Sequence, residues 1–244
     1  LSILKYSSKA IMGIDDVAVL HRKHLDNVPV TTYGFEGSDI QITKIGSISE
    51  TLNRQINFKT AKSSFSVTTQ LVGRHSAKAL AAAVAVGLEF GIEETPIKRG
   101  VQAVQSFPGR MRVLQGKKEC MLIDDTYNAS PFAAKAALEA LYEIQGRPRF
   151  AVLGSMNELG DYSEQAHKEI GAMCYKDKLT AVVTIGKMAN DWLAMVAGQN
   201  GVPVMRFESP YAAGWWLAEN APRHAAILFK GSQNGVFAEE AVKI

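Results

Sequence analysis

The chain has 244 residues, of which 47% are hydrophobic and 21% charged, a composition that excludes disordered and fibrous proteins. Its formal net charge of +3 comes from 27 basic and 24 acidic residues spread along the chain, so nucleic acid is not expected as a partner. At roughly 100 to 200 residues per domain, this length predicts two domains.

Cysteine usage and hydropathy indicate a cytoplasmic protein without membrane insertion. Cys120 and Cys174 are far apart and lack His or Cys neighbours at metal-ligand spacing, so we expect two reduced thiols and no zinc site. The longest apolar stretch, residues 77–90, contains Lys78 and Glu89 and is shorter than the ~20 residues of a membrane span. It is predicted to be a buried helix.

The first part of the chain reads as short strands followed by helices. The strands are predicted at residues 28–33, 39–45, 55–59 and 65–71, joined as antiparallel hairpins. Before them, a short helix is predicted over residues 17–24. After them, Ser76 is expected to cap a helix that Gly91 ends, and Thr95 with Pro96 predicts the start of a second helix.

A Ser-Phe-Pro-Gly segment at residues 106–109 is the predicted domain boundary. Proline disfavours helix in the residue before it, and glycine frees the backbone after it. We therefore expect separate cores in residues 1–105 and 107–244.

Beyond this boundary, strands alternate with helices. The strands are predicted at residues 111–115, 119–124, 150–154, 181–185, 202–207 and 225–229. The helices are predicted at residues 131–145, 163–175, 188–197, 209–220 and 236–242, with Ser209 and Pro210 as a cap and first-position proline. This alternation predicts an α/β domain with a doubly wound, mainly parallel sheet covered on both faces.

Ligands of such a sheet bind where strands end, which directs attention to four loops. They lie at residues 124–131, 153–160, 186–187 and 230–235. None is a Gly-x-Gly-x-x-Gly fingerprint, which disfavours an NAD site, and neither Gly-Lys pair in the chain is followed by Ser or Thr as in a phosphate loop. The residues also offer no Ser/His/Asp or Cys/His set for nucleophilic catalysis.

Several of these segments, in this order, resemble the Mur ligase family. They are Phe-Pro-Gly-Arg at residues 107–110, Ile-Asp-Asp-Thr-Tyr-Asn-Ala-Ser-Pro at 123–131, Val-Leu-Gly-Ser-Met-Asn-Glu-Leu-Gly at 152–160 and Phe-Lys-Gly-Ser at 229–232. Upstream, Gly-Arg-His-Ser at 73–76 is similar to the family's Gly-Arg-His-Asn. The resemblance implies that residues 1–105 are the second half of a central ATP-binding domain and that residues 107–244 are a Rossmann-like carboxyl-terminal ligase domain.

The resemblance implies an ATP-dependent peptide ligase that works through an acyl phosphate. The segments are most similar to the member that adds D-alanyl-D-alanine to UDP-N-acetylmuramoyl-tripeptide in peptidoglycan synthesis, a cytoplasmic monomer. ATP and Mg²⁺ are the implied cofactors. Because the chain starts at Leu1 without a methionine, we expect it to continue a longer protein. The phosphate loop and magnesium ligands would lie in that preceding part, no residue here is assigned to a metal, and the chain alone is expected to be inactive.

Six site residues follow from the resemblance. Arg110 would contact the γ-phosphate as the catalytic residue; Asp125, Asn128 and His75 would bind the nucleotide; Lys230 and Ser232 would face the substrates. Simpler roles remain open: a linker residue for Arg110, a helix cap for Asp125, a turn residue for Asn128.

The chain departs from the family pattern at several positions. Ser76 and Ala79 stand where the family has the asparagines that help to hold adenine, so the adenine pocket is expected to be built differently. At three other positions, Ser130 replaces the family's asparagine, Ser155 its aspartate and Gln233 its arginine. Glu158 and His167 match the pattern, and we expect structural roles for both.

Two other functions remain open. One is another ligase of the superfamily, similar to folylpolyglutamate synthase. The other is a non-catalytic Rossmann-like binding module, because the phosphate loop is missing and a fold does not determine a function.

Overall fold

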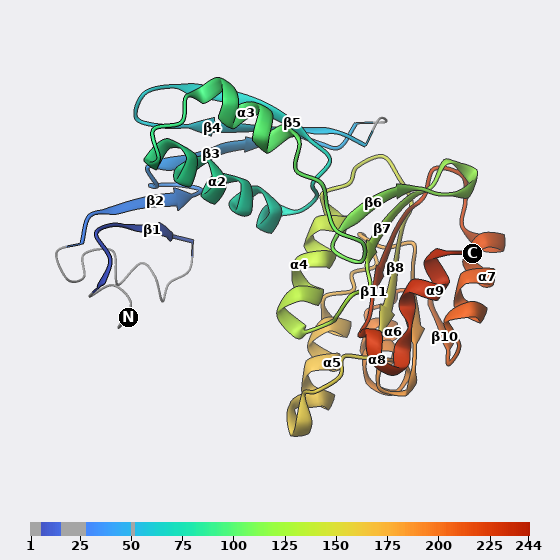
Figure 1. Ribbon diagram of the computed structural model, residues 1–244. Helices are drawn as coiled ribbons and strands as arrows, with labels where there is room; N and C mark the ends of the chain where they lie inside the picture. Colours follow the sequence, from blue (N-terminus) through green and yellow to red (C-terminus); the bar gives the residue numbers. More distant parts are fainter. Residues whose placement is uncertain (1–5, 16–27, 50–51) are drawn as a thin grey trace. The chain divides into compact units, whose positions relative to one another are not determined.

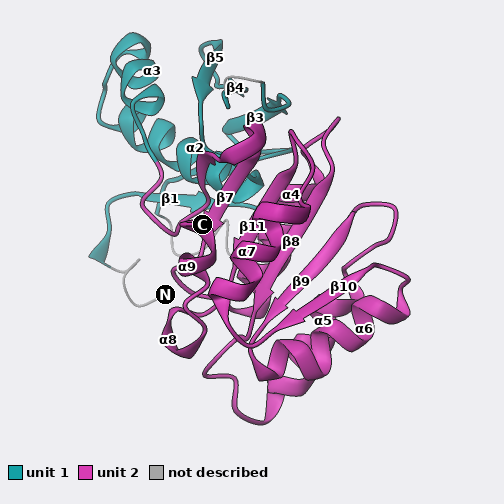
Figure 2. Ribbon diagram, turned by 90° about the vertical axis from the view of Figure 1, so that its right-hand side faces the viewer, with its two compact units in different colours: residues 1–105 teal, residues 106–244 magenta. Residues whose placement is uncertain are grey.

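The computed structural model describes residues 6–15, 28–49 and 52–244. The chain divides into two compact units, Leu1–Gln105 (unit 1) and Ser106–Ile244 (unit 2), which Figure 2 colours separately. The helix predicted over residues 17–24 lies outside the described residues. The assignment of residues 1–105 to half of a central domain remains a prediction.

Unit 1 is a sheet with helices packed against it (Figure 1). The strand order is β1-β2-β3-β4-β5, formed by β1 (Ala10–Gly13), β2 (Val30–Gly34), β3 (Ile40–Ile45), β4 (Arg54–Lys59) and β5 (Ser64–Thr69). The helices are α2 (Arg74–Glu89) and α3 (Glu94–Gln102). Alternation along β4 and β5 turns Ile56, Phe58 and Val67 toward Leu80 and Val84 of α2, and these residues form the core.

The predicted antiparallel pairing is confirmed for β3 with β4 and for β4 with β5. It is wrong for β2 with β3. β2 runs parallel to β3, with Tyr33 opposite Ile40, and also parallel to β1, a strand too short for its pattern to predict. The side chain of Asp39 explains the turn: its Oδ2 accepts hydrogen bonds from the backbone N–H (2.7 Å) and the hydroxyl (2.6 Å) of Thr32. These bonds connect Thr32 of β2 to the residue directly before β3.

The helix starts predicted at residues 131, 163 and 209 in unit 2 are correct to within one residue, and the two predicted after the strands of unit 1 are wrong. α2 begins before Ser76, whose hydroxyl donates to the carbonyl of Val72 at 2.8 Å instead of capping. α3 likewise begins before Thr95. In unit 2, Ser209 caps its helix as predicted by accepting a hydrogen bond from Ala212 N–H at 3.4 Å.

Unit 2 is a three-layer α/β structure, as the alternating pattern predicted. Its strand order is β10-β9-β8-β11-β7-β6, and β6 pairs antiparallel with β7 while the other neighbouring strands are parallel. The strands are β6 (Arg112–Gln115), β7 (Met121–Asp125), β8 (Arg149–Gly154), β9 (Ala181–Ile185), β10 (Val204–Phe207) and β11 (Ala226–Lys230). This confirms the doubly wound, mainly parallel sheet.

The helices of unit 2 cover both faces of the sheet. Figure 1 shows α4 (Pro131–Tyr142) and α5 (Ser163–Ala172) on one side, and α7 (Pro210–Asn220) and α9 (Ala238–Val242) on the other. The remaining elements are short turns of 3-10 helix at Lys117–Glu119 and Gly160–Tyr162, a π-helical turn at Ala189–Leu193, α6 (Ala194–Gln199) and α8 (Gln233–Val236). The helix predicted over residues 236–242 is interrupted because Phe237 takes a left-handed conformation between α8 and α9.

The strand order of unit 2 has a switch point at β11. β11 lies between β7 and β8 although it is the last strand in the chain. The connection after β7 runs through α4 on one face, and the connection before β11 runs through α7 on the other. The order of successive strands across the sheet therefore reverses here while the strands stay parallel, and such switch points leave a crevice at the carboxyl ends of the strands.

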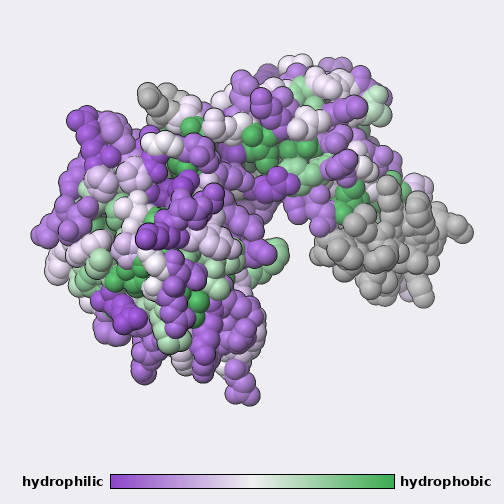
Figure 3. All heavy atoms as spheres, turned by 180° about the vertical axis from the view of Figure 1, so that it is seen from behind, coloured by the Kyte–Doolittle hydropathy of each residue, from purple (hydrophilic) through white to green (hydrophobic). Residues whose placement is uncertain are grey.

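The surface is largely hydrophilic on the face shown in Figure 3, with small hydrophobic areas between the polar side chains. Among the helices in the described part of the chain, none combines the length and the apolar character that a membrane span requires.

Candidate functional site

The carboxyl ends of β7 and β11 carry a buried ion pair. Asp125 and Lys230 are the last residues of these neighbouring parallel strands and stand opposite each other in register. The Nζ atom of Lys230 lies 2.6 Å from Oδ2 of Asp125, and the two residues are 4% and 7% exposed. Buried charges persist when they are paired and hydrogen-bonded, so the surroundings of this pair matter.

Both side chains of the pair have further partners. Nζ of Lys230 donates to the backbone oxygen of Asn128 at 2.6 Å and to that of Asp125 at 3.4 Å. Oδ1 of Asp125 accepts from the N–H of Met111 at 3.1 Å. An ammonium group has three donors, and these contacts engage all three. The nucleotide contact predicted for Asp125 and the substrate contact predicted for Lys230 therefore remain predictions; here the two residues contact each other.

A second carboxylate, which the sequence did not mark as functional, lies beside the pair. Asp124 is 9% exposed. Its Oδ2 accepts from Gly109 N–H at 3.0 Å, and its Oδ1 accepts from the N–H (3.3 Å) and hydroxyl (2.7 Å) of Thr126. The available signal was a second acidic residue at the end of a strand that is otherwise apolar, where an unpaired buried charge would be costly. Asp124 thus shapes the backbone on both sides of β7.

The loops after β7, β8 and β11 meet at Ser232. Its buried hydroxyl donates to Oδ1 of Asn128 at 3.5 Å and accepts from Asn157 N–H at 3.0 Å, while its own N–H donates to the backbone oxygen of Ser155 at 3.2 Å. Oδ1 of the exposed Asn128 also accepts from Ala129 N–H at 2.8 Å. Because this oxygen is occupied, the NH₂ group is what Asn128 can offer to a ligand.

His167 is hydrogen-bonded to the loop after β8. It is buried in α5, its Nε2 accepts from Met156 N–H at 2.9 Å, and its Nδ1 lies 2.7 Å from the backbone oxygen of Ser163. These contacts require a neutral ring with its hydrogen on Nδ1. Burial lowers the pKa of His167, and the hydrogen bond to Ser163 opposes that shift only in part. The expected structural role agrees with this position.

We expect the stability of unit 2 to decrease as the pH falls below about 6.5, the ordinary pKa of histidine. The folded-state pKa of His167 is lowered, so the unfolded chain takes up the proton first. The stabilising contribution is complete above the unfolded pKa and is lost as the pH falls through the folded one. Thermal melting between about pH 8 and about pH 5 measures this loss.

His167→Gln should flatten this pH dependence, because the amide cannot be protonated in this range. The matched control is His75→Gln, which removes an exposed histidine of unit 1 and should keep the dependence of the unsubstituted chain. Equal slopes for His167→Gln and the unsubstituted chain would show that His167 does not titrate with unfolding.

Arg110 lies at the surface next to the turn after β7. Its N–H donates to the backbone oxygen of Phe107 at 3.1 Å, which closes the predicted turn. Its guanidinium carbon lies 4.0 Å from the centre of the Tyr127 ring. Arg110 is exposed, so its charge is accessible to a ligand at the crevice.

The structure places five of the six predicted site residues in unit 2. They are Arg110, Asp125, Asn128, Lys230 and Ser232. His75 belongs to unit 1, where it is an exposed residue in the first turn of α2. Within the described ranges, no group of three or more His, Cys, Asp and Glu side chains is arranged to hold a metal ion.

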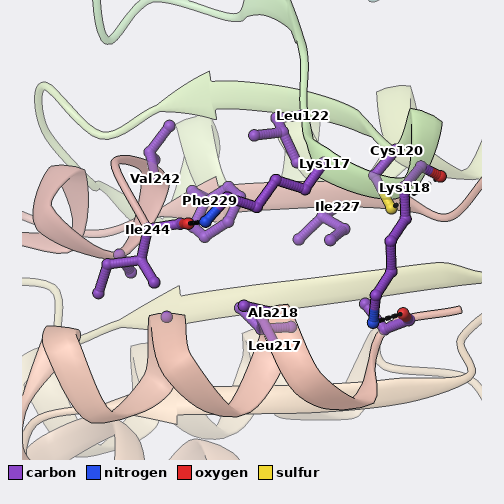
Figure 4. A pocket seen from close by; sticks show the side chains of 13 residues that line it. Lys117, Lys118, Cys120, Leu122, Leu217, Ala218, Ile227, Phe229, Val242 and Ile244 are labelled. Atoms are coloured by element: carbon purple, nitrogen blue, oxygen red, sulfur yellow. Dashed lines mark hydrogen bonds between the residues drawn. The ribbon is translucent and has the colours of Figure 1, made fainter. Parts of the chain in front are cut away.

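A cavity of about 60 Å³ also lies in unit 2, between the sheet and α7 (Figure 4). Aliphatic side chains such as Leu217 and Ile227 form much of its lining. The amines at its margin are engaged: Lys117 donates to the backbone oxygen of Ile244 at 2.6 Å and Lys118 to that of Ala221 at 3.2 Å. Its lining contains no Asp, Glu or His, so it offers no carboxylate or imidazole for acid–base chemistry.

Known proteins match this chain in sequence and in fold. A family profile described as "Mur ligase, glutamate ligase domain" matches residues 109–233. The UDP-N-acetylmuramoyl-tripeptide--D-alanyl-D-alanine ligase of Bacillus subtilis is 33% identical over 182 residues, covering 71% of this chain and 38% of that protein. The protein of the same description from Synechocystis sp. is 31% identical over 205 residues, covering 83% of this chain and 42% of that protein.

Among solved structures, the MurF ligase from Thermotoga maritima in complex with ADP superposes with a TM-score of 0.81 at 25% sequence identity. The superposition covers 99% of this chain and 54% of that one. The chain therefore spans about half the length, or less, of the proteins it matches.

Proposed function

Because the chain belongs to the Mur ligase family, we propose that the whole protein is an ATP-dependent ligase that adds D-alanyl-D-alanine to UDP-N-acetylmuramoyl-tripeptide in peptidoglycan synthesis. The observation that carries the proposal is the group of side chains at the carboxyl ends of β7 and β11, which includes Asp125, Asn128 and Lys230. These residues lie within the matched residues 109–233, and the two relatives described by this activity cover 71% and 83% of this chain.

The reaction makes an amide bond at the expense of ATP. The tripeptide carboxylate takes the γ-phosphoryl group and ADP leaves; the amine of D-alanyl-D-alanine then attacks the acyl carbon, and phosphate leaves. Such chemistry depends on positioning and on neutralising negative charge, which suits a crevice with cations and amide donors and without a nucleophile.

We assign the roles on the crevice accordingly. Arg110 offers an exposed guanidinium, which matches phosphate oxygens in a fork geometry. Asn128 offers its NH₂ group to the nucleotide, and His75 of unit 1 is proposed as a further nucleotide contact. Asp125 is likewise proposed as a nucleotide contact. Lys230 and Ser232 are proposed to face the substrates, and their contacts with Asp125 and Asn128 keep them next to the proposed nucleotide contacts.

ATP and Mg²⁺ complete the proposal. The ADP of the Thermotoga maritima structure supports a nucleotide in this family. Mg²⁺ would neutralise the phosphates when bound. We assign no residue of this chain to it.

We propose a monomer in the cytoplasm. Cys120 and Cys174 are both buried and unpaired, as expected in a reducing compartment. Burial raises the pKa of Cys174 to about 12, so it has no accessible thiolate for redox chemistry.

The proposal is tested by determining which amine the full-length protein consumes. With ATP, Mg²⁺ and UDP-N-acetylmuramoyl-tripeptide, it should consume D-alanyl-D-alanine and release one phosphate for each peptide bond formed. Phosphate release and the mass of the product measure this. The 244-residue chain is the control and should give no turnover, because its sequence contains no Gly-Lys-Ser or Gly-Lys-Thr loop.

Two other outcomes identify the alternatives. Consumption of glutamate with a folate acceptor would support a ligase similar to folylpolyglutamate synthase. Absence of ATP-dependent amide formation with every acceptor, together with a start codon near Leu1 in the gene, would support a non-catalytic module.

A further inference from the structure

The residues directly before and after Arg110 are both hydrogen-bonded to the end of β7. The N–H of Gly109 donates to Oδ2 of Asp124 at 3.0 Å, and its backbone oxygen accepts from Tyr127 N–H at 3.0 Å. On the other side, Met111 N–H donates to a carboxylate oxygen at the end of the same strand at 3.1 Å. The backbone of Arg110 therefore has a defined position relative to the crevice before any ligand binds.

Gly109 allows the two backbones to come this close. Its φ of +70° lies in the left-handed region, and a Cβ atom at this position would lie 2.9 Å from the backbone nitrogen of Tyr127. A side chain would therefore separate the turn from the strand end. The close approach places the Tyr127 ring beside the side chain of Arg110.

The Tyr127 ring contacts the guanidinium instead of filling the core. The residue is 51% exposed, and the guanidinium carbon of Arg110 lies 4.0 Å from the centre of its ring. A planar guanidinium is attracted to the face of an aromatic ring by cation–π interaction and by stacking. The contact uses the face of the ring, so the hydroxyl group is not required for it.

We propose that Tyr127 is a positioning residue for Arg110: it holds the guanidinium in few rotamers at the mouth of the crevice, ready for the terminal phosphate of a nucleoside triphosphate. An arginine side chain has much rotamer freedom, and restricting it before binding lowers the entropy lost on reaching the transition state. This inference rests on the proposed function, because the phosphate contact of Arg110 is part of that proposal.

The kinetic test is a double-mutant cycle in the full-length protein. Tyr127→Leu should lower kcat roughly two- to fivefold, as expected for an exposed cation–π contact, with a smaller change in the KM for ATP. Tyr127→Phe keeps the ring and should retain the original kcat. In an Arg110→Ala background, Tyr127→Leu should cause no further loss. An unchanged kcat in Tyr127→Leu, or the same loss in both backgrounds, would overturn the proposal.

A second measurement does not depend on activity. In the 244-residue chain with isotope-labelled arginine, ring currents from Tyr127 should shift the side-chain NMR signals of Arg110 upfield. Arg110→Lys identifies these signals by their loss. The shift should persist in Tyr127→Phe and disappear in Tyr127→Leu.

The two measurements separate the possible failures. Unshifted Arg110 signals in the unsubstituted chain would overturn the positioning contact alone. Shifted signals in a full-length protein without ligase turnover would overturn the proposed function and the catalytic use of the contact with it.

Discussion

Replacing Lys230 with methionine should lower the free energy of unfolding of unit 2 by about 3–5 kcal/mol. The substitution preserves the length of the apolar stem but removes the ammonium group that lies 2.6 Å from Asp125. The carboxylate, in a residue only 7% exposed, would then be a buried charge without its partner. The backbone oxygen of Asn128 would lose its donor as well. Urea unfolding of the 244-residue chain, followed by circular dichroism, measures the loss.

The matched control is an ion pair of the same length at the surface. Lys187 lies 2.6 Å from Asp191, and their side chains are 82% and 46% exposed. Lys187→Met should leave stability almost unchanged, because an exposed pair is screened and both groups stay solvated.

A compensating change tests the mechanism. Asp125→Asn in the Lys230→Met background removes the buried negative charge and keeps an oxygen for the N–H of Met111, so it should restore most of the lost stability. Equal effects of Lys230→Met and Lys187→Met would show that burial does not make the pair important.

The fold of unit 2 was predictable because its signals are local. Residues 111–242 alternate between strand-like and helix-like periods, and Ser209 with Pro210 marks a helix start within a few residues. The insertion of β11 between β7 and β8 has no local signal, since strand pairing joins residues far apart in the chain. Unit 1 shows the same limit: β2 and β3 are parallel, although the strand pattern predicted a hairpin.

The sequence predicted which residues belong to the site, but it did not predict which of them contact one another. The resemblance and the strand ends drew attention to Asp125, Asn128 and Lys230. The sequence contained no sign that Lys230 would donate to Asp125, which lies 105 positions away. The contact of Tyr127 with Arg110 depends on the close approach at Gly109, which is likewise a property of the folded backbone.

Removing the Arg110 side chain should lower kcat of the full-length ligase roughly a hundredfold, the usual effect of losing one charge-stabilising donor at a reacting centre. The proposed contact is with the γ-phosphate and is strongest while charge moves during transfer, so the KM for ATP should change less than kcat. Arg110→Lys should restore little activity, because a point charge does not reproduce the two-pronged geometry of guanidinium and also loses the stacking contact with Tyr127. Steady-state kinetics with varied ATP measure both parameters.

Arg112→Ala is the matched control for this prediction. Arg112 is also exposed and begins β6, two residues beyond Arg110 in the chain, so its removal changes net charge equally at nearly the same place. Thermal melting of all variants checks that each is folded. If Arg112→Ala lowered kcat as much as Arg110→Ala, the effect would come from the general positive potential of this edge. If both Arg110 variants kept near-normal kcat, Arg110 would be a residue of the linker, and the phosphate contact would have to come from another cation.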